Sequence, residues 1–217
     1  MPEAVKYVIH WGDVATWIGA IATFLAVLVA LRLHTRILPP ALRLSLVAPE
    51  GEATTVVITT IDQNGVVTKE RPEKCRYYHV RLSNSRPWSG ATDAAAQVVK
   101  VESPDASGEF MPIWTGILPV NAAHYGVHPS HTLGAAPRDF DLCSVVRGKW
   151  VELNPRIVPY NFPHRHRGEK PLRLRVTLEA HSLEVVSRIF QFEISWNGQW
   201  DDDTVKMRQH MVVRQVS

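Results

Sequence analysis

The stretch LRLRVTLEA at residues 172–180 decides the fold class of this 217-residue chain. Apolar side chains occupy every second position, and arginine, threonine or glutamate fills the positions between them. Because successive side chains of a β-strand point to opposite faces, the pattern predicts a strand with one buried and one solvated face. The stretch FQFEISW at residues 190–196 repeats the pattern, which predicts that Phe192 and Trp196 point into the core while Glu193 faces water.

Similar short runs continue outward from these two strands. Alternating or β-branched segments occupy residues 42–46, 54–61, 78–82 and 99–101. Turn-forming residues separate them, and no long amphipathic pattern supplies the crossover helix that a parallel sheet needs. We therefore expect a mainly β fold, with an antiparallel β-sandwich and a short C-terminal helix over residues 42–217.

The segment CRYYHVRLSNSRPWSGATDAAAQVVKVES, residues 75–103, contains a strand pattern, a turn, a run of small residues and a second strand pattern. It resembles adjacent strands of the immunoglobulin-like domains found in bacterial single-pass membrane proteins. The resemblance covers roughly residues 42 to 200 and implies an immunoglobulin-like sandwich, although the Cys…Trp…Cys signature of antibody domains is missing. Such sandwiches serve many functions, so the resemblance implies no particular activity.

A different kind of sequence precedes the strands. The stretch VATWIGAIATFLAVLVAL, residues 14–31, is uncharged throughout, and a bilayer core is spanned by about 20 mostly apolar residues. Trp11 and Trp17 at one end, and Arg32 and Arg36 at the other, suit the two membrane interfaces. We therefore expect a transmembrane helix; a buried core helix and a cleaved signal peptide are the alternatives. The expected divisions are a short tail (1–13), the transmembrane helix (14–37), a proline-containing linker (38–41) and the soluble domain (42–217).

The charges that flank the apolar stretch predict its orientation. Lys6 is the only basic residue before it, whereas Arg32, Arg36 and Arg43 follow it. The positive-inside rule then places the N-terminus outside and the soluble domain in the cytoplasm, at the inner (cytoplasmic) membrane of a bacterium. Cysteines in that compartment stay reduced, so both cysteines of the chain are expected to be free thiols.

Small side chains gather on one side of the predicted transmembrane helix. At 100° per residue they fall within one arc, which favours close packing of two helices and predicts a homo-oligomer. The simpler alternative is that small residues are common in all membrane helices. The residues of this helix-packing face are Ala15, Gly19, Ala22, Thr23, Ala26 and Ala30.

Motifs for chemistry are sparse. The sequence contains no nucleotide-binding loop and no hydrolase motif, so we expect no enzyme activity, no cofactor and no metal. The weak candidates for metal ligands are His124, His128 and His131. The acidic run 201–203 is interpreted as the N-cap of the short C-terminal helix.

Basic residues concentrate between residues 147 and 175, where only Glu152 and Glu169 oppose them. The whole chain carries a net charge of only +3, so this concentration is local. A net charge this small does not indicate a nucleic-acid-binding protein, and we expect no specific nucleic-acid binding. The segment between residues 154 and 171, here called the basic loop, predicts contact with an anionic lipid headgroup, small molecule or protein. The alternative is a solvated loop. Its candidate anion-binding residues are Arg156, Tyr160, Phe162, His164, Arg165, His166, Arg167 and Lys170.

Together these patterns predict a membrane-anchored, non-catalytic sensor, effector or interaction protein with a cytoplasmic β-sandwich. Its expected partners are membrane lipids, further copies of itself through the helix, and an anionic ligand. A bacterial stress or anti-phage effector is one such role. The alternatives are a metal-dependent hydrolase that uses the histidine cluster, and a structural subunit of an envelope complex.

Overall fold

A computed structural model of the chain describes residues 11–61, 67–123, 133 and 136–216. It divides into an N-terminal unit, Met1–Pro39, and a β domain, Pro40–Ser217. The first unit contains helix α1 (Trp11–Ile37). Within it, Val14–Leu33 is long and apolar enough to cross a membrane, and none of this stretch is buried. The fold is mainly β, as predicted.

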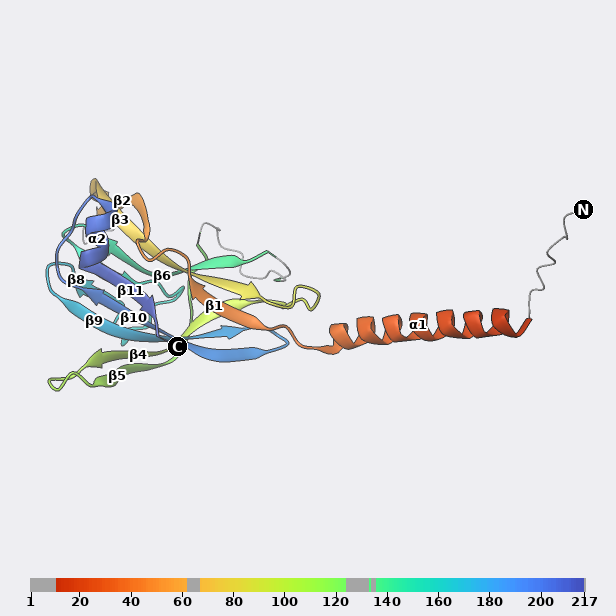
Figure 1. Cartoon of the computed structure of the whole chain (residues 1–217). Helices are drawn as coiled ribbons and strands as arrows, with labels where there is room; N and C mark the ends of the chain where they lie inside the picture. The colour runs from red at the N-terminus through yellow and green to blue at the C-terminus, as the bar shows by residue number, and fades with distance from the viewer. Residues whose placement is uncertain (1–10, 62–66, 124–132, 134–135, 217) are drawn as a thin grey trace, which may run out of the picture. The chain divides into compact units, whose positions relative to one another are not determined.

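The described residues of the β domain form two antiparallel sheets and one short helix (Figure 1). The first sheet has the order β1-β3-β6-β7-β8, with β2 also paired to β3, and the second has the order β11-β10-β9-β4-β5. The elements are β1 (Leu42–Leu46), β2 (Glu52–Ile61), β3 (Val67–Asn84), β4 (Ala95–Pro104), β5 (Phe110–Pro119), β6 (Arg138–Val146), β7 (Trp150–Leu153), β8 (Arg165–Arg167), β9 (Leu172–His181), β10 (Val186–Trp196), α2 (Thr204–His210) and β11 (Met211–Gln215).

Strand β3 organises the first sheet. Its first half pairs with β2 as far as Tyr77, and its second half pairs with β1 from Val80 to Asn84. Its other edge pairs with β6 from Cys75 to Leu82. One strand therefore holds three neighbours in register.

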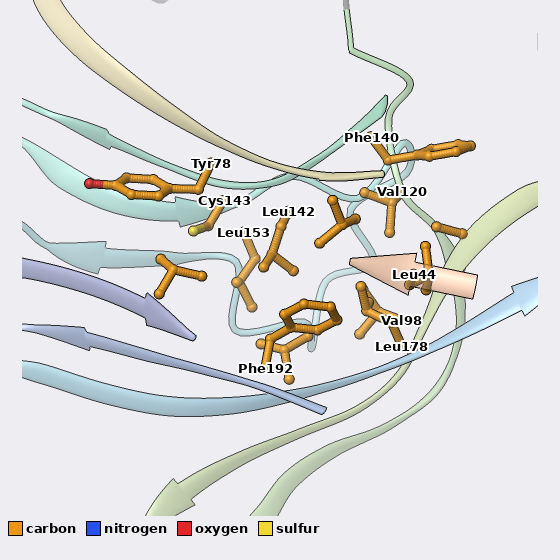
Figure 2. Close-up of a cluster of buried hydrophobic side chains, with 14 of the residues drawn as sticks. Leu44, Tyr78, Val98, Val120, Phe140, Leu142, Cys143, Leu153, Leu178 and Phe192 are labelled. Carbon is orange, nitrogen blue, oxygen red and sulfur yellow. The ribbon is translucent and has the colours of Figure 1, made fainter. Parts of the chain in front are cut away.

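Side chains of both sheets meet in one hydrophobic core (Figure 2). Tyr78 and Cys143 enter it from the first sheet, and Leu178 and Phe192 enter it from the second. Phe192 and Trp196 are both buried, which confirms the predicted register of β10. Each buried side chain of this size contributes about 1.5–3 kcal/mol relative to an exposed one, so the alternating pattern stabilises both sheets at once.

Glu193 was expected to face water, and this prediction is wrong: only 4% of the residue is exposed. It lies on the outer face of β10, where it is ladder-paired with Arg175 of β9 and Arg214 of β11. Arg175 Nη2 donates to Glu193 Oε1 at 2.9 Å, and Arg214 Nε donates to Oε2 at 3.1 Å. Two long arginine side chains therefore cover the carboxylate, and the outer face of the sheet is shielded although it is polar.

The short C-terminal helix begins as predicted. Asp203 caps α2, and one of its carboxylate oxygens accepts hydrogen bonds from the backbone N–H groups of Val205 and Lys206. These bonds lower the pKa of Asp203. Arg76 of β3 ties the same end of α2 to the first sheet, because its Nη2 donates to Thr204 Oγ1 at 3.1 Å.

Both cysteines are free and buried, in agreement with the predicted reduced thiols. Burial is the main reason that the pKa of Cys75 is raised to about 12, and burial also raises the pKa of Cys143. A thiol with so high a pKa is a poor nucleophile at neutral pH.

Replacing Glu193 by Gln should lower the free energy of unfolding by about 1–3 kcal/mol at pH 7, because the charged acceptor of two arginines is lost. The two arginines hold the pKa of Glu193 below its usual range. The stabilisation is therefore present above the pKa of an unfolded glutamate and is lost as the pH falls through the lower folded-state pKa. Denaturant unfolding of the full chain in detergent, followed by tryptophan fluorescence, measures the difference. Glu179→Gln on the same face is the control, and equal effects of both substitutions would contradict the buried-carboxylate account.

Candidate functional site

The basic loop covers the open edge between the two sheets. It leaves β7 of the first sheet, and the N–H of Arg156 donates to the carbonyl of Pro119 at the end of β5 in the second sheet. It then returns to β8 of the first sheet, where the N–H of Leu153 donates to the carbonyl of His164 at 2.7 Å. Its path shows that the loop has a structural role in closing the domain.

Phe162 anchors this closure, and the structure does not place it on a binding surface. Only 4% of Phe162 is exposed, and its ring meets Trp114 edge-to-face with the ring centroids 4.9 Å apart. The expectation that Phe162 takes part in anion binding therefore does not fit its buried position. An aromatic side chain between prolines in a loop carries no periodic pattern, so its burial could not be predicted from alternation.

Three other predicted anion-binding residues have contacts within the domain. His164 Nδ1 lies 3.3 Å from the carbonyl of Phe162, and His166 Nε2 lies 3.2 Å from the carbonyl of Pro163. Burial lowers the pKa of His166, so protonating it takes a lower pH than protonating an ordinary histidine. Arg165 Nη2 donates to both carboxylate oxygens of Glu152, at 3.0 and 3.2 Å, and its guanidinium lies 4.2 Å from the centroid of Trp150.

The remaining four predicted residues are exposed but divide into two places. Arg156 lies where the loop passes the end of β5, and Tyr160 follows four residues later with its ring fully exposed. Arg167 is the last residue of β8 and Lys170 lies in the turn that follows, where the N–H of Lys170 donates to the carbonyl of Arg167 at 3.2 Å. Of these four residues, Arg167 and Lys170 are the two that lie close together.

These two residues lie beside a basic groove that the sequence alone did not reveal. The groove has a volume of about 590 Å³. It is lined by Arg71, Pro72, Glu73 and Lys74 of β3 and by the β6–β7 turn, Arg147, Gly148 and Lys149. The N–H of Arg147 donates to the carbonyl of Lys74 at 3.0 Å, and this bond joins the two walls of the groove.

Two glycines bring the basic segments close together. Gly148 has φ of +61°, a left-handed conformation that turns the chain between Arg147 and Lys149. The N–H of Gly168 donates to the carbonyl of Lys149, and a Cβ on Gly168 would lie 2.9 Å from the backbone of Lys149. Only glycine permits this approach, which sets the turn of Arg167 and Lys170 next to Lys149.

Acidic side chains offset part of the positive charge. Glu73 pairs with Arg71 at 3.1 Å, and Asp202 pairs with Lys74 at 2.7 Å and with Arg147 at 3.6 Å. Lys149 has no ion pair among the contacts of the described residues. Basic groups outnumber acidic groups around the groove, so its potential favours an anion.

A second hollow lies on the outer face of the first sheet, with a volume of about 230 Å³. His79 lies at its centre between two carboxylates: Nδ1 is 2.8 Å from Asp141 Oδ1, and Nε2 is 3.4 Å from Glu52 Oε2. Tyr77 stacks parallel to the imidazole at 6.1 Å between ring centroids. The hydrogen bond to Asp141 is the largest cause of the raised pKa of His79.

The candidate metal ligands His124, His128 and His131 lie outside the described residues. Within the described part of the chain, no group of three or more histidine, cysteine, aspartate or glutamate side chains could hold a metal ion. In the second hollow, His79 stands beside the carboxylates of Asp141 and Glu52.

Comparisons of the chain with protein-family models, with curated proteins and with solved structures found no match. The immunoglobulin-like resemblance of residues 75–103 therefore stays a prediction.

The raised pKa of His79 makes the fold sensitive to pH above 6. Because this pKa is higher in the folded than in the unfolded chain, the stabilisation is full below about pH 6.5 and is lost as the pH rises through the folded-state value. Asp141→Asn should flatten this loss in denaturant unfolding between pH 6 and 9. Asp105→Asn is the control, because the pKa of Asp105 is lowered and it titrates at acid pH. A slope that Asp141→Asn leaves unchanged would contradict the assignment.

Proposed function

We propose that the chain is a single-pass membrane protein with a cytoplasmic β domain, and that it acts without catalysis as a receptor or effector for an anionic ligand or partner. The exposed apolar stretch Val14–Leu33 of α1 is the observation that carries the proposal. Its apolar side chains are exposed, and no contact within the described residues of the N-terminal unit covers them. Burial in a lipid bilayer would remove them from water.

Local hydrogen bonding in α1 supports a lipid environment. Thr23 Oγ1 donates to the carbonyl of Gly19 at 2.8 Å, so this hydroxyl group is satisfied within the helix. A polar group within the hydrocarbon region that finds its partner in its own helix avoids the cost of an unsatisfied group. Arg32 and Arg36 follow the apolar stretch and favour a cytoplasmic C-terminal side.

A reporter fused after Ser217 tests the proposed topology. A fluorescent protein that matures only in the cytosol should be active, and an alkaline phosphatase that folds only in the periplasm should be inactive. Each fusion serves as the control for the other at equal expression. Active phosphatase with a dark fluorescent fusion would reverse the orientation and contradict the proposal.

The helix-packing face from Ala15 to Ala30 supports a homo-oligomer as part of the proposal. Gly19→Ile should weaken self-association in a membrane dimerisation assay, because the larger side chain keeps two helices apart. A Cβ at Gly19 meets no atom within 4 Å, so the substitution causes no clash in the chain itself. Ile21→Ala on the opposite side of the helix is the control, and equal effects of both substitutions would contradict a specific face.

The basic groove is the proposed anion site, in place of the basic loop as a whole. The exposed cations Arg147 and Lys149 stand on one turn, and Arg71 and Lys74 face them from β3. A phosphate-rich ligand would be held mainly by charge, so its affinity should fall as salt rises. The basic residues that concentrate after residue 147 lie largely on two turns, the β6–β7 turn and the turn after β8. The N–H of Gly168 donates to the carbonyl of Lys149, so the two turns meet at the groove.

Binding of inorganic tripolyphosphate to the full chain in detergent, measured by calorimetry at low salt, tests this site. Arg147→Glu combined with Lys149→Glu should weaken binding at least about tenfold, a change of about 1.4 kcal/mol. Arg43→Glu combined with Arg156→Glu makes the same charge change at exposed positions elsewhere. Equal losses in both variants would show that only overall charge matters and would contradict the groove.

We also propose that the β domain is an immunoglobulin-like sandwich and that the protein works as a bacterial stress or anti-phage effector. The shared core of the two sheets supports the first proposal. The combination of an apolar helix with a ligand-receiving domain supports the second, because ligand binding and helix association can then be linked in one chain.

A further inference from the structure

Large apolar side chains are exposed at the end of the β domain where β1 begins, here called the tether end. Leu42, the first residue of β1, is paired with Asn84, the last residue of β3. Trp88 and Leu183 are 54% and 69% exposed, and Val186 is more than half exposed. Exposed single apolar residues are ordinary, but a group of them on neighbouring loops indicates an interaction surface.

Hydrogen bonds join these loops to one another and to the tether. The N–H of Ser85, which begins the loop carrying Trp88, donates to the carbonyl of Ala41 at 3.0 Å. At the other end of that loop, the carbonyl of Thr92 accepts from the N–H of Leu183 at 3.0 Å. Trp88 and Leu183 therefore belong to adjacent segments of one surface.

Side-chain caps hold both loops in shape. Asn84 Oδ1 accepts from the N–H groups of Ala41 and Arg86, each at 3.0 Å, and Asn84 Nδ2 donates to the carbonyl of Ser89. Ser182 Oγ accepts from the N–H groups of Glu184 and Val185, each at 3.2 Å. These bonds fix the backbone of both loops, on which Trp88 and Leu183 are exposed.

We propose that the tether end rests on the lipid bilayer, with Trp88, Leu183 and Val186 inserted into its interfacial region. The proposal rests on the membrane anchorage proposed above. Only residues 38–41 separate α1 from β1, and four residues span at most about 14 Å. With so short a tether, the exposed tryptophan and aliphatic side chains at this end of the domain lie within reach of the membrane interface. Tryptophan favours that interface.

This placement separates the two surfaces of the domain. Strand β3 runs ten residues from Lys74 at the basic groove to Asn84 at the tether end, which is roughly 33 Å for an extended strand. With the tether end on the lipid, the groove faces the cytosol. The two surfaces thus fit a membrane and a soluble anionic ligand, respectively.

Full-length chain in nanodiscs of neutral phosphatidylcholine tests the proposal. An environment-sensitive fluorophore on Leu183→Cys should emit at shorter wavelength, and doxyl-labelled lipids should quench more than half of its emission. The same fluorophore on Val205→Cys is the control. Val205 is 71% exposed on α2, and Arg76 bonds the start of α2 to β3 at a point eight residues before Asn84. The control position therefore lies away from the tether end. The native thiols are buried and do not compete for the label. In the Leu183→Cys background, Trp88→Glu should reduce the quenching.

Equal quenching at the two positions, or none at Leu183, would overturn the inference. A blue shift at Leu183 without quenching by doxyl lipid would mean that protein, such as a second copy of the chain, covers the loops, and it would overturn the inference as well. Co-elution of the chain with the nanodisc checks the membrane anchorage separately. Anchorage without quenching rejects only this inference, whereas loss of the chain from the nanodisc rejects the proposed function itself.

Discussion

The β domain depends on the antiparallel pairing of β3 with its neighbours more than on any other interaction. One face of this strand supplies Tyr78, Val80 and Leu82 to the shared core. The other face supplies Tyr77 and His79 to the hollow beside Asp141. Because side chains alternate along a strand, a shift of one residue in register would exchange the two sets. The core, the hollow beside Asp141 and the basic groove therefore depend on the same pairing.

Electrostatics shapes the outer surfaces of both sheets in a similar way. Glu193 lies under Arg175 and Arg214, while His79 lies between Asp141 and Glu52. In each case neighbouring side chains supply the hydrogen-bonding partners of a partly desolvated group. The basic groove differs, because its cations outnumber the carboxylates around it. This excess is the physical reason for treating the groove, and not the paired clusters, as the anion site.

The sequence predicts local features well because they depend on residues close together in the chain. The alternation at 172–180 and 190–196 predicts two strands and the burial of Phe192 and Trp196, and Asp203 caps the helix that follows it. The same reasoning gives the wrong result for Glu193, because arginines on neighbouring strands cover its carboxylate. The spacing of apolar residues along one strand does not indicate which polar group a long side chain of another strand will shield.

The candidate sites show the same limit. Arg71 and Lys74 approach Arg147 only because β3 pairs with β6, and no local pattern specifies that pairing. Phe162 is apolar in a segment without periodicity, so its burial depends on the gap between sheet edges that it fills. The sequence shows how many basic residues there are. Contacts between residues far apart in the chain determine which of them line the groove.

The central claim is that α1 crosses the membrane and leaves the β domain in the cytosol. Thiol labelling of single cysteines with a membrane-impermeant maleimide tests it most directly, with Ala4→Cys before α1 and Gln215→Cys at the end of β11. In intact spheroplasts the account predicts labelling at position 4 alone, and at both positions once the membrane is permeabilised. Labelling at position 215 in intact spheroplasts would contradict it.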